Sequence, residues 1–329
     1  MKLLVDYFKK GKFFCAIAFG FLLFLGCNEG DKVEKAIAQI DANVRISRFD
    51  REFAMAKPGD IQHLKQRYPY LFPAQYADSV WVAKLADTLQ IQLSSEAEKE
   101  FGDLGEQEAD LELLFKHIKY YFPDYEIPKV VTLASDVDYD NRVVLADTLL
   151  LINLDNYLGK EHEFYRGIQN YIASGLDKQF MVSDVASAFA QRVVPRPENR
   201  NFLSHIIYYG KILYLKDKLI PFDTDAQKIG YLPEQYAWAQ ANEEQIWRYF
   251  IENQLLYSTD QKPRPRFLDP APFSKFGLEL DNESPGGVGR YMGWQIVRSF
   301  MEHNDVTLRQ LLSLPADEIF KKSNYKPKK

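Results

Sequence analysis

Cys27 is the residue whose surroundings point most directly to a chemical modification. It follows Leu25 and Gly26, and Phe13–Leu25 is an almost wholly apolar run behind a lysine-rich start. A charged start, a short apolar run and small residues before a cleavage point are typical of an export signal. A cysteine directly after the glycine is the lipoprotein form of that signal, in which the acylated thiol becomes the mature amino terminus. We therefore predict that residues 1–26 are a lipoprotein signal peptide and that Cys27 is lipidated.

The apolar run is shorter than the roughly 20 residues that a membrane-spanning helix needs. An ordinary signal peptide or an uncleaved anchor is the alternative. Each buried acyl methylene contributes about 0.8 kcal/mol, so two or three chains on Cys27 would hold the protein on a membrane. Residues 27–43 would then form a lipidated start and tether with a short helix, and residues 44–329 the folded domain. We expect a cell-envelope protein outside the cytoplasm, with the outer membrane as the expected location.

Four aspartates form the best candidate for a small-ligand site, a calcium loop. Asp136, Asp138 and Asp140 stand at alternate positions, and Asp147 follows where an acidic residue would close such a loop. Calcium loops of this kind have a glycine after the third ligand and helices on both sides. Here Asn141 replaces the glycine and the flanking segments are predicted strands. A hairpin turn, in which Asp and Asn side chains bond their own backbone, is the favoured interpretation.

The histidines do not form a common catalytic motif. The mature chain has five of them, and no two have the spacing of an HExxH zinc pair. The GxSxG nucleophile turn and the GxxxxGK phosphate loop are also missing from the sequence. Cys15 would leave with the signal and Cys27 would be acylated, which excludes thiol catalysis and disulfides. His162, Glu163 and His205 are the residues that an atypical envelope hydrolase could use.

The charge balance is acidic. The formal net charge is −5, and removal of residues 1–26 takes away four lysines and one aspartate, which leaves about −8. This balance argues against nucleic acid or anionic lipid as a main partner. The carboxyl-terminal run 321–329 is basic, and a solvated terminus is favoured over a contact with an acidic partner.

Glycines near the carboxyl terminus suggest close helix packing. Pro285, Gly286 and Gly287 suit a sharp helix start. Gly289 and Gly293 are four residues apart among apolar side chains, which favours a buried helix packed closely against a neighbour over an anion site.

Hydrophobic periodicity predicts a mainly helical protein with a small sheet in its first half. Segment 44–53 begins with alternation and is a predicted strand, and 128–133 with 141–154 form a predicted β-hairpin. Segment 260–273 is rich in proline and is a predicted loop. Helices are expected at 79–101, 106–121, 161–174, 180–193, 201–218, 233–254, 287–303 and 307–322. The fold class is therefore α+β, in a single domain.

The chain as a whole resembles the GldB family of gliding-motility lipoproteins. The segments that carry the resemblance are RFDREF (48–53), YPYLFP (68–73), LFKHIKYYFP (114–123), SDVDYDNR (135–142), LDNYLG (154–159), YYGKILYLKD (208–217), NEEQIWRYF (242–250), DPAPFSKF (269–276) and ESPGGVGRYMGWQIVRSFME (283–302). The resemblance implies an envelope lipoprotein needed for gliding, a process coupled to type IX secretion. It implies no catalytic activity and no cofactor, and its implied partners are other envelope proteins of gliding and secretion.

A more distant likeness connects residues 284–325 with the carboxyl-terminal part of predicted HExxH zinc proteases. In that alignment Ser183, Asp184 and Ser187 stand where the zinc helix is expected, and Tyr209 stands where a third ligand is expected. Serine is a poor zinc ligand. The likeness therefore implies a degenerate protease-like scaffold that has lost its metal and serves binding. A non-catalytic binding or assembly component is the favoured function, and an envelope hydrolase is the alternative.

Overall fold

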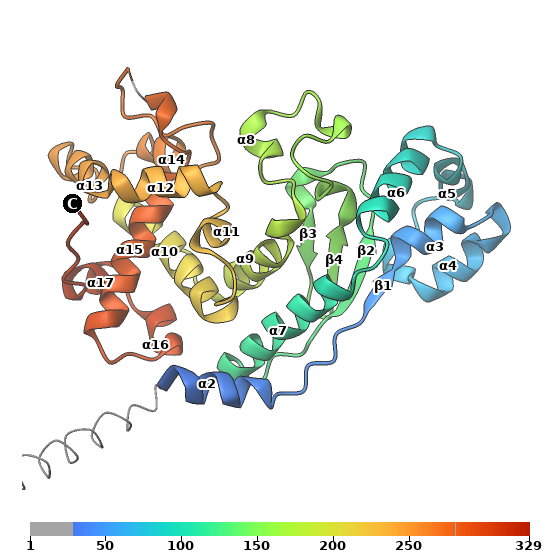
Figure 1. Cartoon of the computed structure of the whole chain (residues 1–329), viewed down its shortest axis with the longest axis horizontal. Helices are drawn as coiled ribbons and strands as arrows, with labels where there is room; N and C mark the ends of the chain where they lie inside the picture. Colours follow the sequence, from blue (N-terminus) through green and yellow to red (C-terminus); the bar gives the residue numbers. More distant parts are fainter. Residues whose placement is uncertain (1–28, 280) are drawn as a thin grey trace, which may run out of the picture. The chain divides into compact units, whose positions relative to one another are not determined.

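The strands form one mixed sheet in the computed structural model, which describes residues 29–279 and 281–329 (Figure 1). The strand order is β1-β2-β4-β3. Strands β1, β2 and β4 are parallel, whereas β3 is antiparallel to β4 at one edge. The strands are β1 (Ile46–Arg48), β2 (Lys129–Leu133), β3 (Val143–Leu145) and β4 (Leu149–Asn153).

The chain divides into two units, with the division between Asp41 and Ala42. The first unit contains helix α2 (Glu29–Ala38), which agrees with the predicted short helix of the tether. The second unit contains the sheet. Its longer helices are α3 (Phe49–Met55), α4 (Ile61–Arg67), α5 (Asp78–Leu85), α6 (Thr88–Glu100), α7 (Gly105–Tyr121), α9 (Met181–Val193), α10 (Phe202–Leu219), α12 (Pro233–Ala241), α13 (Glu243–Glu252), α15 (Val288–His303) and α17 (Ala316–Lys322). Its shorter helices are α8 (Asn170–Ala173), α11 (Asp225–Ile229), α14 (Pro263–Phe267) and α16 (Leu308–Ser313).

The predicted hairpin between 128–133 and 141–154 is wrong. Strands β2 and β4 are parallel neighbours, and the hairpin joins β3 to β4 within the second segment. Three successive residues of β2 are buried, namely Val130, Val131 and Thr132, and Leu150 and Ile152 of β4 are buried as well. Continuous apolar runs of this kind are typical of parallel strands covered on both faces. The sequence showed that both segments were strands but did not determine how they pair.

The predicted strand at 44–53 is correct only for β1. The chain turns into helix α3 at Phe49, because Phe49 and Phe53 are four residues apart and both are buried on one helical face. The Arg48 guanidinium also bonds the Asp50 carboxylate across this junction, at 2.7 Å. The alternation of apolar and polar residues therefore indicated a strand only in the first part of segment 44–53.

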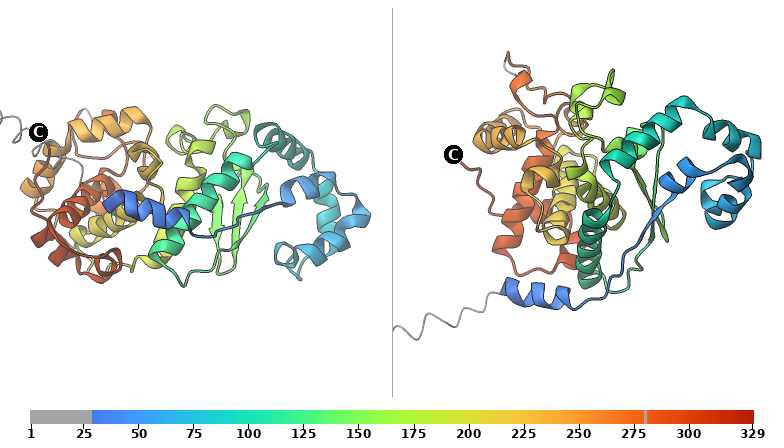
Figure 2. Two further views of the ribbon diagram at one scale, coloured as in Figure 1. Left: turned by 60° about the horizontal axis from the view of Figure 1, so that its bottom comes forward. Right: turned by 45° about the vertical axis from the view of Figure 1, so that its right-hand side comes forward.

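Helices lie on both faces of the sheet (Figure 2). Two hydrophobic cores of different size fill the space between the sheet and these helices. The smaller core contains Val131 of β2 together with residues of α3 and α4. The larger core contains Val130 and Ile152 together with residues of α7, α9, α10 and α15. The pleat of the strands explains this division, because successive side chains point to opposite faces.

The long helices agree best with the prediction. Helices α7, α9, α10 and α15 match the expected segments closely, and the α+β class is confirmed. The expected helix 79–101 is interrupted between α5 and α6, 233–254 is interrupted at Asn242, and 307–322 is divided before Pro315. The expected helix 161–174 is wrong for most of its length, because only Asn170–Ala173 is α-helical. The predicted loop 260–273 contains the short helix α14.

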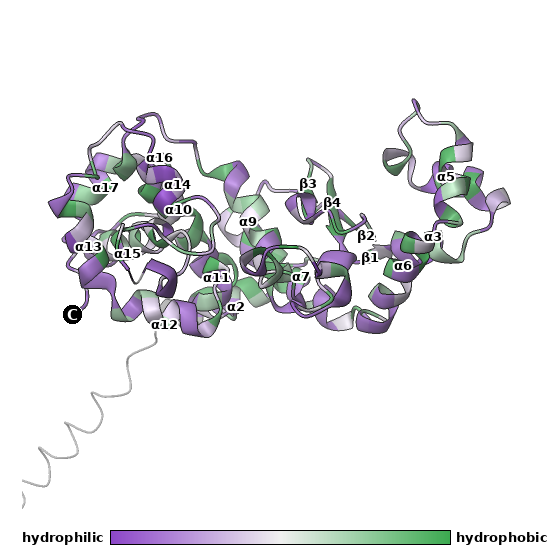
Figure 3. Ribbon diagram, turned by 90° about the horizontal axis from the view of Figure 1, so that it is seen from above, coloured by the Kyte–Doolittle hydropathy of each residue, from purple (hydrophilic) through white to green (hydrophobic). Residues whose placement is uncertain are grey.

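The predicted close packing of the glycine-containing helix is confirmed. Helix α15 packs on α10, and both helices are labelled in Figure 3. A methyl group added at Gly293 would overlap the backbone carbonyl of Ile206, and one added at Gly210 would overlap Gly293. The two helices therefore approach more closely than any side chain at these positions would allow.

The carboxyl-terminal run is held against the fold, so the expected solvated terminus is wrong for part of it. The buried Glu243 carboxylate accepts hydrogen bonds from the Tyr325 hydroxyl at 2.8 Å and from the Lys328 backbone N–H at 3.1 Å. Tyr291 of α15 donates to the same carboxylate at 2.7 Å. Among the residues described, no helix is both long and apolar enough to cross a membrane.

Candidate functional site

Helix α9 carries Ser183, Asp184 and Ser187, the three residues that align with the expected zinc-binding helix. Ser183 and Ser187 are one helical turn apart, and both hydroxyl groups donate to backbone carbonyls within the fold. The Ser183 hydroxyl donates to the carbonyl of Gln227 at 2.7 Å, and the Ser187 hydroxyl donates to the carbonyl of Ser183 at 2.9 Å. Each hydroxyl proton therefore has a structural partner.

A lysine on the neighbouring helix α10 completes this arrangement. Lys216 is only 3% exposed, and its Nζ donates to the Ser187 hydroxyl oxygen at 2.8 Å. Burial lowers the pKa of Lys216 to about 8, although the nearby Asp184 carboxylate acts in the opposite direction. The amine is therefore still mostly protonated at neutral pH. Its positive charge lies directly beside the Ser187 hydroxyl.

Asp184 does not act as a free carboxylate. The Arg142 guanidinium bonds both of its oxygens, at 3.0 Å and 2.8 Å, and the Tyr157 hydroxyl donates to it at 2.9 Å. Burial opposes the charge of Arg142, yet the Asp184 carboxylate keeps its pKa above the usual value. Burial raises the pKa of Tyr157 well above its usual value. Arg142, Asp184 and Tyr157 thus form one hydrogen-bonded cluster.

A second ion cluster lies farther along α10. Arg298 of α15 bonds the carboxylate of Asp217 at 2.7 Å and that of Asp225 at 2.7 Å, and its guanidinium lies 3.7 Å from the Trp294 ring centre. Burial alone would raise the pKa of Asp225, but the Arg298 guanidinium and the Tyr236 hydroxyl lower it to about 2. We refer to the following residues as the buried ion network: Arg142, Asp184, Lys216, Asp217, Asp225, Lys228 and Arg298.

Tyr209 does not meet the serines of α9. It is seven residues before Lys216 on the same helix, about 10 Å along the axis. The Arg290 guanidinium lies 4.5 Å from its ring centre. The α10 residue beside Ser187 is therefore Lys216, which the sequence analysis did not single out. Helical spacing could have found it, because Lys216 follows the buried Ile212 by four residues and precedes the buried Leu219 by three.

The residues of this site do not fit a zinc ion. Zinc sites use thiolate, imidazole and carboxylate ligands, whereas Ser183 and Ser187 offer hydroxyls that are bonded internally. The Lys216 ammonium would repel a cation beside them. Over residues 29–279 and 281–329, no group of three His, Cys, Asp or Glu side chains is placed to hold a metal ion.

The four aspartates of the candidate calcium loop are not brought together. Asp136 pairs with Lys84 at 2.9 Å, and Asp147 pairs with Arg192. Asp138 accepts a hydrogen bond from the backbone N–H of Asn141 at 3.3 Å, which agrees with the turn interpretation. Asp140 is exposed.

The turn around Asp136 is stabilised by Asp155, which is not one of the four candidate aspartates. The buried Asp155 carboxylate accepts from the backbone N–H groups of Ser135 at 2.9 Å and Val137 at 2.7 Å. These bonds hold the positive φ angles of Asp136 and Val137.

The residues named for an atypical hydrolase have separate surroundings. His162 Nε2 lies 3.4 Å from the Glu96 carboxylate and stacks on Phe164. His205 lies on α10, where burial and the charge of Arg264 lower its pKa. Glu163 begins a short 3-10 turn after His162. Cys27, the predicted lipidation site, lies outside the described residues.

One comparison with known proteins gives a match. The model of the family described as gliding motility protein GldB matches residues 30–327, which is nearly all of the chain behind Cys27. No curated protein and no solved structure matches the chain significantly. The match includes both the buried ion network and the sheet. The chain therefore belongs to the GldB family of gliding-motility lipoproteins.

Proposed function

We propose that this lipoprotein acts in gliding as a non-catalytic component that binds and assembles other envelope proteins. The observation that carries the proposal is the arrangement of α9 and α10. The hydroxyls of Ser183 and Ser187 are bonded to backbone carbonyls, and Lys216 is buried beside them. A site for hydrolysis needs an available nucleophile, base or metal-bound water, whereas these groups serve to join two helices.

The proposal includes a lipid anchor on Cys27, an outer-membrane location and a connection with type IX secretion. The export signal before Cys27 and the family membership support it. The acidic charge of the mature chain supports protein partners over nucleic acid. The same proposal treats α9 as the degenerate zinc helix of a protease-like scaffold. A stoichiometric amount of zinc, measured by elemental analysis of the purified protein, would refute that part.

Replacement of the anchor tests the role of the tether. We expect Cys27→Ala cells to lose gliding while the protein leaves the membrane fraction, because the acyl chains provide the membrane affinity. The matched control is Cys15→Ala, since that cysteine lies in the predicted signal peptide. Normal gliding by cells whose Cys27→Ala protein is soluble would contradict the proposal.

A second set of variants tests the absence of catalysis. We expect the double variant His162→Ala, His205→Ala to glide normally, provided that its unfolding midpoint is close to that of the parent protein. We expect the same of Ser187→Ala. Loss of gliding by a variant that still folds and reaches the membrane would favour the hydrolase alternative.

A further inference from the structure

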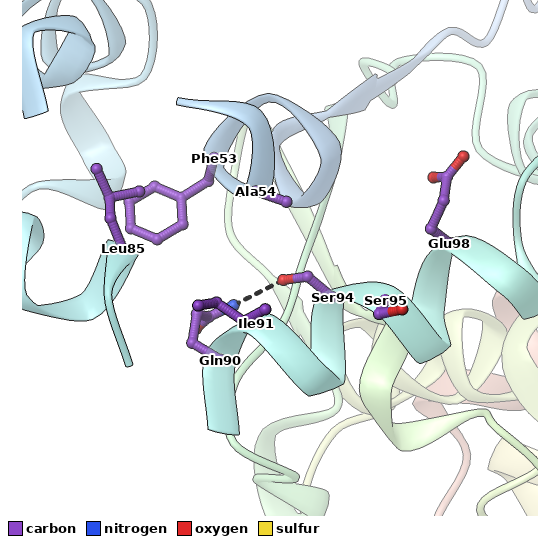
Figure 4. Close-up of a pocket in the computed structure, with 8 residues that line it drawn as sticks. All are labelled: Phe53, Ala54, Leu85, Gln90, Ile91, Ser94, Ser95 and Glu98. Atoms are coloured by element: carbon purple, nitrogen blue, oxygen red, sulfur yellow. Dashed lines mark hydrogen bonds between the residues drawn. The ribbon is translucent and has the colours of Figure 1, made fainter. Parts of the chain in front are cut away.

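A small apolar groove lies where helices α3, α5 and α6 meet (Figure 4). Glu98 at its end is already paired with Arg48 and Arg51. The contacts of the described residues do not show what covers the groove, so it does not indicate a partner. Its walls are formed by Phe53, Ala54, Leu85, Gln90 and Ile91.

A cavity beside α10 differs from the groove, because it combines a buried charge with apolar walls. It lies between α10, residues 195–199 of the preceding segment and residues 312–316 where α16 is joined to α17. The residues that line it from α10 are three or four positions apart and therefore share one helical face. They are Ser204, Ile207, Tyr208 and Lys211. The cavity volume is about 300 Å³, at the lower end of the range of about 300–1,000 Å³ for small-ligand sites.

Lys211 supplies the buried charge. It is only 7% exposed, and its Nζ donates to the carbonyl oxygens of Leu312 at 3.0 Å and Leu314 at 2.7 Å. These two bonds cap the carboxyl-terminal end of α16. An ammonium group has three N–H donors, so one donor of Lys211 is left for a further acceptor. Because Lys211 lines the cavity, a molecule inside the cavity can supply that acceptor.

The other buried lysines show what Lys211 lacks. Lys211, Lys216 and Lys228 are the buried lysines of the described residues. Lys228 lies 3.3 Å from the Asp217 carboxylate, and the charge of Lys216, which burial opposes, is favoured by the Asp184 carboxylate. Lys211 has no such carboxylate within the described part of the chain, and burial lowers its pKa to about 8. A buried cation of this kind is unfavourable until an anion reaches it.

The other charges at the cavity fit a ligand with a single negative charge. Arg196 lines the cavity, is exposed, and pairs with no carboxylate of residues 29–279 and 281–329. Burial raises the pKa of Tyr208, and the charge of Arg196 opposes that rise, so the two groups lie near each other. Glu198 also lines the cavity. Two positive side chains and one negative side chain therefore leave a single net positive charge at the lining.

Apolar groups form much of the remaining wall. Pro195, Pro197 and Pro315 have fixed φ angles, so the parts of the wall that they form are largely preorganised. Ile207 and Leu312 add aliphatic side chains. An inorganic anion would pair with the charge of Lys211 but would leave these walls without a contact. An organic acid uses both the charge and the walls.

We propose that this cavity binds a small organic acid, whose carboxylate bonds the Lys211 ammonium and whose apolar body lies against the prolines. Arg196 would pair with the same carboxylate from the exposed side of the cavity. A free carboxylic acid and the carboxyl-terminal residue of a polypeptide both carry this chemistry, and the experiment distinguishes them. The inference goes beyond the proposed function and does not depend on the lipid anchor.

Calorimetric titration of the full lipoprotein in detergent micelles tests the inference. The probes are hexanoate, the neutral analogue hexanamide, inorganic phosphate, and N-acetyl-leucine as a model of a polypeptide carboxyl terminus. Empty micelles are the blank. We expect one acid bound per chain, with hexanamide and phosphate roughly tenfold weaker because each lacks one of the two contacts. The acid that binds more tightly, hexanoate or N-acetyl-leucine, identifies the source of the carboxylate.

Substitutions locate the binding at this cavity. Lys211→Met removes the charge and keeps an unbranched apolar side chain, and we expect roughly tenfold weaker binding of the acid. Arg196→Gln should weaken it about threefold, because this arginine is exposed. Arg200→Gln is the matched control, since Arg200 is an exposed arginine of the same segment that does not line the cavity. Unfolding midpoints are measured for each protein, and Arg196→Gln remains the test if Lys211→Met fails to fold without its cap on α16.

The inference is overturned if neither acid binds at millimolar concentration, or if hexanamide or phosphate binds as tightly as hexanoate. Unchanged binding by a folded Lys211→Met protein, or equal effects of Arg196→Gln and Arg200→Gln, would also overturn it. These titrations measure the ligand alone, so their failure leaves the proposed function intact. Normal gliding by cells with a soluble Cys27→Ala protein would instead refute the proposed function and leave the acid site intact.

Discussion

Helices α9, α10 and α15 bury charged side chains, whereas helices α3 to α6 expose apolar side chains. In the first region, charged groups such as Lys216 and Asp184 are inside the fold, and each has a partner there. In the second region, apolar groups such as Ile91 and Leu89 face solvent, and the Gln90 carbonyl has no partner among the described residues. Buried charges must be paired, whereas exposed apolar surface is free to bind.

This difference separates side chains that stabilise the fold from side chains that contribute little to it. A change in the first region should mainly alter the free energy of unfolding, because the buried charged groups Lys216, Asp184 and Arg298 have internal partners there. A change at the exposed side chains of the groove should alter it little, because they have few internal contacts.

Gly293→Ala should destabilise the protein most. The added methyl group would overlap the Ile206 carbonyl, so α10 and α15 would have to separate. We expect a loss of about 3 kcal/mol or more in the free energy of unfolding, since overpacking costs about 1–3 kcal/mol even where side chains can shift. Urea unfolding measures it. Gly59→Ala is the control, because nothing lies near its added methyl group.

Arg298→Met should have the next largest effect. It leaves Asp217 and Asp225 without the guanidinium between them, although Lys228 is still 3.3 Å from Asp217. We expect a loss of about 2–3 kcal/mol, below the usual range for a broken buried pair because Arg298 is partly exposed. Arg248→Met removes an exposed pair with Glu244 and should cost about 0.5 kcal/mol or less. Equal losses of stability in the Arg298→Met and Arg248→Met proteins would show that burial does not strengthen the ion pairs of Arg298.

Lys216→Met should stabilise the protein at neutral pH. The folded-state pKa of Lys216 is lowered to about 8 from 10.5, so between these values the unfolded chain binds more protons than the folded one. The stability of the parent protein therefore rises with pH across that window. At about 1.4 kcal/mol per pKa unit, less the lost bond to Ser187, we expect a gain of about 1–2 kcal/mol at pH 7.

Thermal unfolding as a function of pH measures this effect. The advantage of Lys216→Met should shrink as the pH rises from 8 to 10.5. Lys218→Met, at a partly exposed position on the same helix, should show no such trend. A destabilised Lys216→Met protein at every pH would mean that the bond to Ser187 outweighs the burial of the charge.

Ile91→Asp should change stability least. Its side chain is more than half exposed, so we expect a change within about 0.5 kcal/mol, as for most surface substitutions. Leu93→Asp, at a fully buried position on the same helix, is the contrasting variant and should prevent normal folding. A large loss of stability for Ile91→Asp would mean that Ile91 belongs to the small core, and the contrast between the two regions would then be wrong.

Long amphipathic helices were predictable because their periodicity depends only on near neighbours. Helices α9, α10 and α15 agree with the sequence analysis for this reason. The segment 79–101 shows the limit of the argument. Leu85, Leu89 and Leu93 have the spacing of one continuous apolar face, yet the helix is interrupted after Leu85 and only Leu93 is buried. The interruption turns part of an expected core face into the rim of the groove.

The candidate sites were less predictable than the helices. Asp136 and Asp147 looked like members of one ligand set, but each pairs with a basic residue from a distant segment. Lys216 was not among the predicted site residues, although its ammonium bonds Ser187 of α9. Pairing between distant segments has no local signature, and this explains why the contact of Ser187 with Lys216 of α10 was not predicted.

By itself, the amino-acid sequence determined the helical character of the domain, the acidic balance and the family resemblance, because composition, periodicity and motifs are local properties. The predicted lipid anchor on Cys27 has the same origin. Only the tertiary structure decided that β2 and β4 are parallel, that Lys216 is buried against Ser187, and that Ile91 faces an open groove. These features depend on which distant segments come together, and that is settled by the packing of the whole chain.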